Sequence, residues 1–258
     1  MQWITLFRKE TLENWRNFKW IWVPLVMILI ACMDPVSTYY LPQIIDAVGG
    51  MPEGAVINLP EYNPSDIIFM SLSQFSSLGV LIIVLMSMGS IASERKSGVL
   101  ELILVKPVSY KNYITAKWMS LLLLVWLSFI LGMLASWYYI NLLFGGMPFS
   151  SLLYVILFYG LWLTLVVTLS IFYNSLVKTP GLVAFLTILT IMIMSIITKI
   201  FAQYLEWSPS NLSGHIQQLL AKNEIPVDLL GSTGITILMI ILLLTGSIYT
   251  FKSKELAN

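Results

Sequence analysis

The charged residues of this chain are gathered into a few clusters, and the long stretches between the clusters carry no charge. A helix crosses the hydrocarbon core of a bilayer with about 20 apolar residues, so each of these stretches is long enough to span it. The charge-free runs are 67–93, 118–177, 179–198 and 229–251. The second run has room for two spans, separated by a turn at Gly145, Gly146 and Pro148. With a first span near 20–40, the pattern predicts six transmembrane helices.

Composition agrees with this pattern, because 58% of the residues are hydrophobic and only 10% are charged, against roughly 25% charged in a soluble domain. We therefore expect an all-α integral membrane protein with one transmembrane domain over residues 1–258. The first span is short, since Asp34 follows Lys19 closely, and we place Asp34 in the outer interface unless the span is tilted. The expected spans are 20–40, 67–92, 114–140, 151–174, 180–203 and 229–251.

Basic residues predict the orientation of the spans. If the N-terminus lies inside, twelve of the fourteen basic residues fall on the cytoplasmic side, and only Lys199 and Lys222 fall outside. The positive-inside rule favours this arrangement. We expect a multi-pass protein of the cell membrane with both termini cytoplasmic and with extracellular loops at 41–66 and 204–228. The second loop should hold a short amphipathic helix around 215–221, in which Ile216 and Leu219 share a face and the lone His215 is solvated.

Residues 1–19 differ from a spanning segment, because aromatic residues recur every three or four positions and basic residues fill the other faces. This pattern is typical of an amphipathic helix in the membrane interface. The alternative is a simple extension of the first span. The residues that we expect at the interface are Phe7, Arg8, Trp15, Arg16, Phe18 and Trp22.

The segment 93–113, which we call the coupling segment, is apolar in its middle although basic residues flank it. Gly98 permits a sharp change of direction, and Pro107 interrupts the short helix that follows. Ser109 is placed to cap the helix that leads into the third span. The short helix has too many apolar residues for one face, so it would lie in a partner's groove, on lipid or against its own chain; periodicity alone leaves these open.

Several kinds of chemistry have no motif in this chain. There is no G-x-x-x-x-G-K-[ST] phosphate loop and no H-E-x-x-H, and one histidine and one cysteine make a metal site improbable. We expect no enzyme, no metal and no nucleic-acid partner. Carboxylates are also missing from the predicted span centres, where ion-driven carriers usually keep them. If the chain moves a solute uphill, we expect another chain to supply the energy.

The coupling segment resembles a motif of the ABC-2 type transporter permeases, and among them of the YxlG-type permeases of Gram-positive bacteria. The motif E-R-x-x-G-x-L-E-x-[IL]-L-x-x-P-[VI]-S, followed by A-K, is carried here by Glu94, Arg95, Gly98, Leu100, Glu101, Ile103, Leu104, Pro107, Val108, Ser109, Ala116 and Lys117. One departure is Val99, where many relatives have threonine.

The resemblance implies the ABC-2 (type V exporter-like) fold and a permease subunit of an ATP-binding cassette exporter. In that family two permeases, identical or homologous, sit on two ATPase subunits that bind ATP and Mg²⁺, and this segment docks in an ATPase groove. The resemblance assigns the docking contacts to Glu94, Gly98, Val99, Leu100, Glu101, Leu102, Ile103 and Pro107. The alternatives are a secondary carrier or channel, and a membrane scaffold that transports nothing.

Three polar residues of the second span, Ser73, Gln74 and Ser77, are candidates for the transport path. Small and hydroxyl residues in spans more often serve close helix packing. The sequence leaves both roles open, and it does not identify the substrate.

Overall fold

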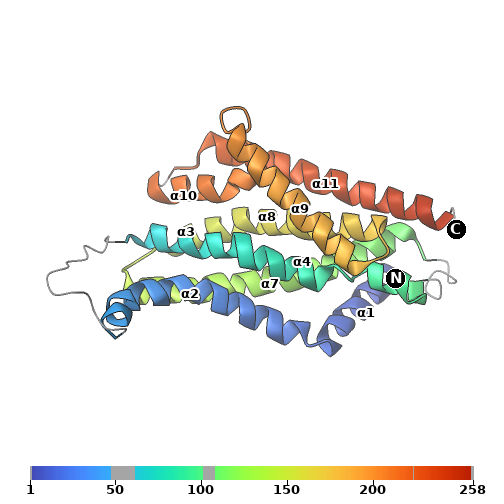
Figure 1. Cartoon of the computed structure of the whole chain (residues 1–258), viewed down its shortest axis with the longest axis horizontal. Helices are drawn as coiled ribbons and strands as arrows, with labels where there is room; N and C mark the ends of the chain where they lie inside the picture. The colour runs from blue at the N-terminus through green and yellow to red at the C-terminus, as the bar shows by residue number, and fades with distance from the viewer. Residues whose placement is uncertain (1, 48–61, 101–107, 223, 257–258) are drawn as a thin grey trace.

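The computed structural model describes residues 2–47, 62–100, 108–222 and 224–256, and these residues fold into helices joined by short turns (Figure 1). The longer helices are α1 (Gln2–Arg16), α2 (Lys19–Ala47), α3 (Pro64–Gln74), α4 (Val80–Ser87), α7 (Tyr110–Leu143), α8 (Phe149–Leu176), α9 (Pro180–Ile200), α10 (Leu212–Lys222) and α11 (Val227–Leu256). The shorter ones are the π-helix η1 (Phe75–Gly79), α5 (Ala92–Lys96) and the 3-10 helix η2 (Pro209–Asn211).

Within the residues that the structure describes, six helical stretches are long and apolar enough to cross a bilayer. They are Lys19–Ile45, Pro64–Lys96, Tyr110–Leu143, Phe149–Leu176, Pro180–Ile200 and Val227–Lys254. The predicted all-helical fold with six spans is therefore confirmed. We call the end of the bundle that holds α1, α5 and the last turns of α11 the proximal end, and the opposite end the distal end; the two ends of the chain lie at the proximal end (Figure 1).

The first span is longer than predicted. Helix α2 continues to Ala47 although Pro24, Pro35 and Pro42 lie inside it, so the segment that we expected to be loop from residue 41 begins as helix. Asp34 consequently lies within α2 and is partly buried, rather than at the outer end of a span. The sequence had left two alternatives, an Asp34 in the outer interface or a short and tilted first span.

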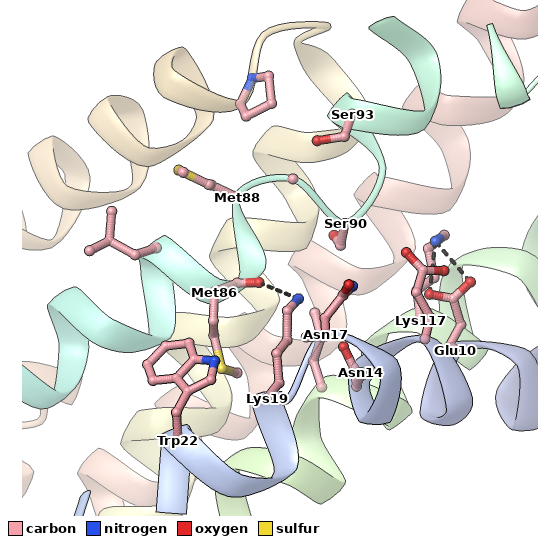
Figure 2. Close-up of a pocket in the computed structure, with 15 residues that line it drawn as sticks. Glu10, Asn14, Asn17, Lys19, Trp22, Met86, Met88, Ser90, Ser93 and Lys117 are labelled. Atoms are coloured by element: carbon pink, nitrogen blue, oxygen red, sulfur yellow. Dashed lines mark hydrogen bonds and ion pairs between the residues drawn. The ribbon is translucent and has the colours of Figure 1, made fainter. Parts of the chain in front are cut away.

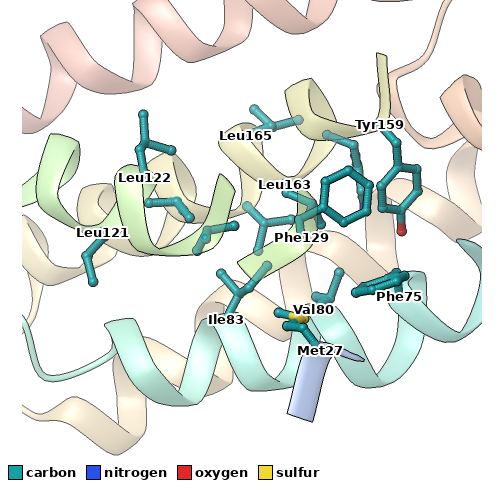
Figure 3. Close-up of a cluster of buried hydrophobic side chains, with 14 of the residues drawn as sticks. Met27, Phe75, Val80, Ile83, Leu121, Leu122, Phe129, Tyr159, Leu163 and Leu165 are labelled. Carbon is teal, nitrogen blue, oxygen red and sulfur yellow. The ribbon is translucent and has the colours of Figure 1, made fainter. Parts of the chain in front are cut away.

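Helix α8 is the centre of the bundle, because 78% of its apolar stretch is buried, compared with 22% for α9 and for α11. Figure 3 shows the apolar core beside it, where α2, η1, α7 and α8 contribute side chains. The rings of Phe75 and Phe129 meet edge to face with centroids 5.2 Å apart, and Tyr159 lies 5.5 Å from Phe129. Such aromatic pairs add to the burial that holds spans together.

Helices α2 and α7 pack closely because small residues line their contact. A Cβ atom on Gly132 of α7 would lie 3.0 Å from the carbonyl oxygen of Met27. One turn further along, Ser136 shares a 3.2 Å hydrogen bond with Ser71 of α3, and Ser71 donates to the carbonyl of Ala31 at 3.1 Å. Small residues and interhelical hydroxyl bonds are the usual means of helix association in membranes.

The distal loop between α9 and α11 contains the predicted amphipathic helix as α10, whose residues Ile216 and Leu219 are buried. The prediction for His215 was wrong. Its side chain is only 9% exposed, and its Nε2 lies 2.9 Å from the carbonyl oxygen of Glu206. His215 precedes Ile216 on the helix and shares the buried side, where α10 packs on α3 and α8.

Candidate functional site

The proximal end of the bundle brings α1, α5 and the first turns of α7 together. A break at Asn17–Phe18 turns the chain from α1 into α2, and Phe18 there has a positive φ of 56°. A bulky residue in this left-handed conformation is strained, so tertiary contacts must hold it. The break lets α1 lie along α7 instead of continuing the axis of α2.

A cluster of charges, buried except for Lys9, joins these three elements; we call Lys9, Glu10, Glu94, Tyr113 and Lys117 the proximal charge cluster. Lys117 of α7 has a side chain only 1% exposed. Its Nζ lies 2.9 Å from both carboxylate oxygens of Glu10 and 3.0 Å from Oε1 of Glu94. Figure 2 shows Lys117 and Glu10 meeting at one edge of a cavity.

Lys9 and Tyr113 complete the proximal charge cluster. The Nζ of Lys9 lies 2.8 Å from Oε1 of Glu94 and 3.0 Å from Oε1 of Glu10, and the hydroxyl of Tyr113 donates to Oε2 of Glu94. Burial opposes the charged form of Lys9, but the carboxylates of Glu10 and Glu94 outweigh that effect and raise the pKa of Lys9 above its usual range. Two ammonium groups thus balance two carboxylates at the junction.

The three carboxylates of Glu10, Glu13 and Glu94 approach one another closely enough to suit a metal ion. However, the ammonium groups of Lys9 and Lys117 contact these same carboxylates. They already supply the positive charge that a metal would bring, so the arrangement fits an internal ion-pair network better than a metal centre.

Asn174 of α8 fixes the turn between α4 and α5. Its Oδ1 accepts the backbone N–H groups of Ile91 and Ala92 at 3.1 and 3.0 Å, and its Nδ2 donates to the carbonyls of Ser87 and Ser170 at 3.1 and 2.9 Å. The amide therefore uses its full hydrogen-bonding capacity. It satisfies N–H groups at the start of α5 that have no helical partner.

Arg95 ties the other side of α5 to α8 and α11. Its Nη1 donates to the carbonyl of Ser175 at 2.9 Å, and its guanidinium carbon lies 4.8 Å above the centre of the Phe251 ring. Together with the proximal charge cluster and Asn174, these contacts attach the five-residue helix α5 to α1, α7, α8 and α11. A force applied to α5 would reach all four helices.

A cavity of about 460 Å³ lies beside the proximal charge cluster, between the α1–α2 break and the turn that joins α4 to α5. Lys19, at the start of α2, donates to the carbonyl of Met86 at 3.0 Å across it (Figure 2). Asn14 of α1 donates to Ser120 of α7 at 3.1 Å on the other side. Single hydrogen bonds on either side of this cavity thus hold the α1–α2 break to α4 and α7.

Comparison with known proteins identifies the family. A sequence profile of the family described as "ABC-2 family transporter protein" matches residues 50–249. The chain is also 31% identical over 253 residues to the "Uncharacterized transmembrane protein YxlG" of Bacillus subtilis (strain 168), covering 98% of both proteins. The chain belongs to the ABC-2 transporter family. It is a membrane component of a transporter, and the resemblance drawn from the coupling segment is confirmed.

The structure divides the ABC-2 motif of this chain into two parts. Glu94, Arg95 and Lys117 point inward, where they hold α5 in place. Glu94 is 9% exposed, so it offers little surface to another subunit.

After α5 the backbone turns at Gly98, whose φ of +73° favours glycine, as the sequence predicted. Val99 is 42% exposed and Leu100 is buried at 2%. The remaining predicted docking residues, Glu101, Leu102, Ile103 and Pro107, lie outside the described residues.

A helix forms where the interfacial helix was predicted, as α1, but its bounds differ from the prediction, and its place in the membrane interface stays a prediction. Helix α1 ends at Arg16, so Phe18 lies in the break and Trp22 in α2. Within α1, Phe7 is partly buried and Arg8, Trp15 and Arg16 are exposed. The buried positions are the polar Glu10 and Asn14. The side of α1 that meets the protein is therefore mixed, with Glu10 and Asn14 beside the partly buried Leu6 and Phe7, and the outer side carries charged residues as well as Trp15.

The polar residues of the second span lie at the π-helix. Ser73 and Ser77 are exposed, and their hydroxyls donate to backbone carbonyls three or four residues earlier in the same span. Gln74 is partly buried. The neighbouring Ser76 shares a 2.7 Å hydrogen bond with Tyr159 of α8. π-Helical turns of this kind often occur at functional sites because they widen the helix locally.

Sequence reasoning did not find Glu10, Lys9, Tyr113 or Asn174. One signal was available: Lys117 stands directly before a 60-residue stretch without charge, where a cation needs a partner. The partner could not be named from the sequence, because Glu10 is 107 residues away. Asn174 gave no signal, since one amide at the end of a span is common.

Proposed function

We propose that this chain is the permease subunit of an ATP-driven exporter, which works as a dimer with separate ATPase subunits. Membership of the ABC-2 family supports the transporter component, and the family implies an ABC ATPase as the partner. ATP and Mg²⁺ would bind to that partner. The split of basic residues favours a cytoplasmic proximal end in the cell membrane, where the ATPase would sit.

The observation that carries the proposal is the attachment of α5. A docking helix can drive spans only if its motion is passed on rather than absorbed by flexible chain. Here Glu94 links α5 to α1 and α7 through Lys117, and Asn174 links it to α8. When the ATPase subunits close, a displacement of residues 99–107 would turn α5 and move these helices together. The cavity beside the α1–α2 break leaves space for that movement.

A dimer agrees with the exposure of the last spans. Helices α9 and α11 keep most of their apolar surface outside the bundle, including Phe185, Met192, Leu238 and Leu242. Lipid would cover this surface in a monomer, and a second permease would cover part of it in a dimer. Six spans enclose little space by themselves, so we place the path between two copies.

The test is a pull-down from membranes solubilised in mild detergent, with wild type beside Leu102→Asp. A phosphate-loop ATPase should co-purify with wild type and be lost from the variant, because a carboxylate would be forced into an apolar groove. Lys252→Asp is the matched control, since it places the same group on an exposed position of the proximal end. Loss of the ATPase from both variants, or from neither, would contradict the docking site.

An ion-coupled carrier is the second candidate, and one observation favours it. Asp34 lies inside α2 rather than at its end, and its Oδ2 is buried without a hydrogen-bond partner among the described residues. Carboxylates within spans often mark ion pathways. This candidate predicts transport without ATP that collapses with the ion gradient and is abolished in Asp34→Asn.

A further inference from the structure

A cavity of about 350 Å³ in the distal half of the bundle has a chemically mixed wall. It lies between α3, α8, α9 and the η2–α10 segment, and α10 packs against α3 and α8 at this end of the molecule (Figure 1). Its polar wall consists of Ser73, Ser76, Tyr159, Ser195, Lys199, Ser210 and Ser213, and its apolar wall includes Phe69, Trp162, Ile191 and Met192. The volume is at the small end of the range for ligand sites, which suits a headgroup better than a whole lipid.

The polar wall has a satisfied part and an unsatisfied part. Ser73 donates to a backbone carbonyl of its own helix, and the hydroxyls of Ser76 and Tyr159 share a hydrogen bond and also bond to the carbonyl of Leu72. Among the described residues, no hydrogen bond joins the partly buried Ser195 or Ser213 to the protein, and the buried Oγ of Ser210 has no partner. The hydroxyl of Ser210, being buried, costs free energy unless a ligand or water supplies a partner.

Lys199 gives this unsatisfied part its charge. It stands one helical turn after Ser195 on α9, so both side chains face the same direction. Within the part of the chain that the structure describes, Lys199 forms no ion pair, and no carboxylate lines the cavity. A lysine with three hydroxyls around it offers hydrogen-bond donors to one anionic group.

We propose that this cavity binds the anionic headgroup, phosphate or carboxylate, of an amphipathic molecule whose apolar body lies against Phe69, Ile191 and Met192. An inorganic anion would use only the polar half of the wall, whereas an amphiphile uses both halves. If the chain is the exporter proposed above, this molecule belongs to its substrate class. The binding step itself does not depend on an ATPase.

The test measures binding to the purified permease alone, by native mass spectrometry with short-chain phosphatidylglycerol and phosphatidylcholine. Wild type should prefer phosphatidylglycerol, and Lys199→Gln should lower that affinity about tenfold, the change expected when one charge-assisted hydrogen bond is lost. Ser195→Ala should lower it less. Lys222→Gln is the matched control, because Lys222 is the other predicted extracellular lysine but does not line the cavity.

Equal affinities of wild type and Lys199→Gln for phosphatidylglycerol would overturn the proposal and would mean that Lys199 only reaches toward the membrane interface. An affinity for inorganic phosphate equal to that for phosphatidylglycerol would overturn the amphipathic part, since the apolar body would then add nothing and the ligand would be a free anion. Stimulation of ATP hydrolysis by phosphatidylglycerol is measured separately in the complex. Binding without stimulation of ATP hydrolysis would refute the amphiphile as a substrate of the exporter but leave the headgroup site standing, whereas loss of the ATPase contact in the pull-down test bears on the exporter itself.

Discussion

Replacing Lys117 by methionine tests the proximal charge cluster most directly. Methionine keeps the length and apolar stem of the side chain but removes its ammonium group. Among the described residues, Lys9 is then the single cation in contact with Glu10 and Glu94, whose side chains are both 11% exposed. Breaking a buried ion pair from one side costs about 3–5 kcal/mol. Lys9 compensates part of this, so we expect a loss of about 3 kcal/mol.

The loss corresponds to a fall in the unfolding midpoint of about 6–12 °C for a chain of this size. The assay is thermal unfolding of the purified protein in detergent, followed by tryptophan fluorescence. Lys222→Met serves as control, because Lys222 is exposed, and it should leave the midpoint nearly unchanged. The double variant Lys117→Met with Glu10→Gln restores neutrality and should recover part of the loss. A midpoint for Lys117→Met equal to wild type, or strictly additive effects in the double variant, would refute the role of the cluster.

Three further changes test the attachment of α5 and the packing of the spans. Asn174→Leu should cost about 2–4 kcal/mol of unfolding free energy, because two buried N–H groups lose their acceptor. Asn141→Leu, at a distal turn, is the comparison. An unchanged unfolding midpoint for Asn174→Leu would argue against the role of Asn174 in holding α5. Gly98→Ala should reduce ATPase association while leaving membrane insertion intact, since alanine at a φ of +73° costs about 1–2 kcal/mol; wild-type levels of co-purified ATPase would contradict this. Gly132→Val should lower the thermal midpoint by several degrees, because the Cβ of the new side chain would lie 3.0 Å from the carbonyl oxygen of Met27. Gly181→Val should leave the midpoint unchanged, because a Cβ at Gly181 meets open space.

Most of the secondary structure could be predicted from the sequence, because the bilayer imposes a strong length requirement on apolar segments. The six spans, the amphipathic helix near 215–221 and the positive φ of Gly98 followed from local pattern alone. The end of α2 did not. We expected a loop from residue 41, but α2 continues to Ala47 with Pro42 inside it; residues 41–44 are exposed, so tertiary packing does not account for this extension.

The N-terminal helix shows what a local pattern leaves open. Its amphipathic pattern identifies a helix, but it does not say which residues meet the protein. Lipid accepts apolar residues as readily as a protein core does, so apolar character alone does not decide the inner side. In the structure Glu10 and Asn14 face inward, toward Lys117 and Ser120, and Trp15 is exposed.

The sequence by itself determined that this chain is a six-span helical membrane protein and, through the coupling segment, pointed to its transporter family. Both properties depend on residues near one another in the chain, namely runs without charge and a motif of 16 consecutive positions. Only the tertiary structure decided what the motif residues do. The attachment of α5 requires that Glu10, Lys117 and Asn174, which are distant in the sequence, all lie beside α5 or the turn before it. The distal cavity likewise requires that Ser195, Lys199 and Ser210 line the same cavity. Charges and hydroxyls gain their energy from partners within about 3 Å, and which partners come that close depends on how the helices pack.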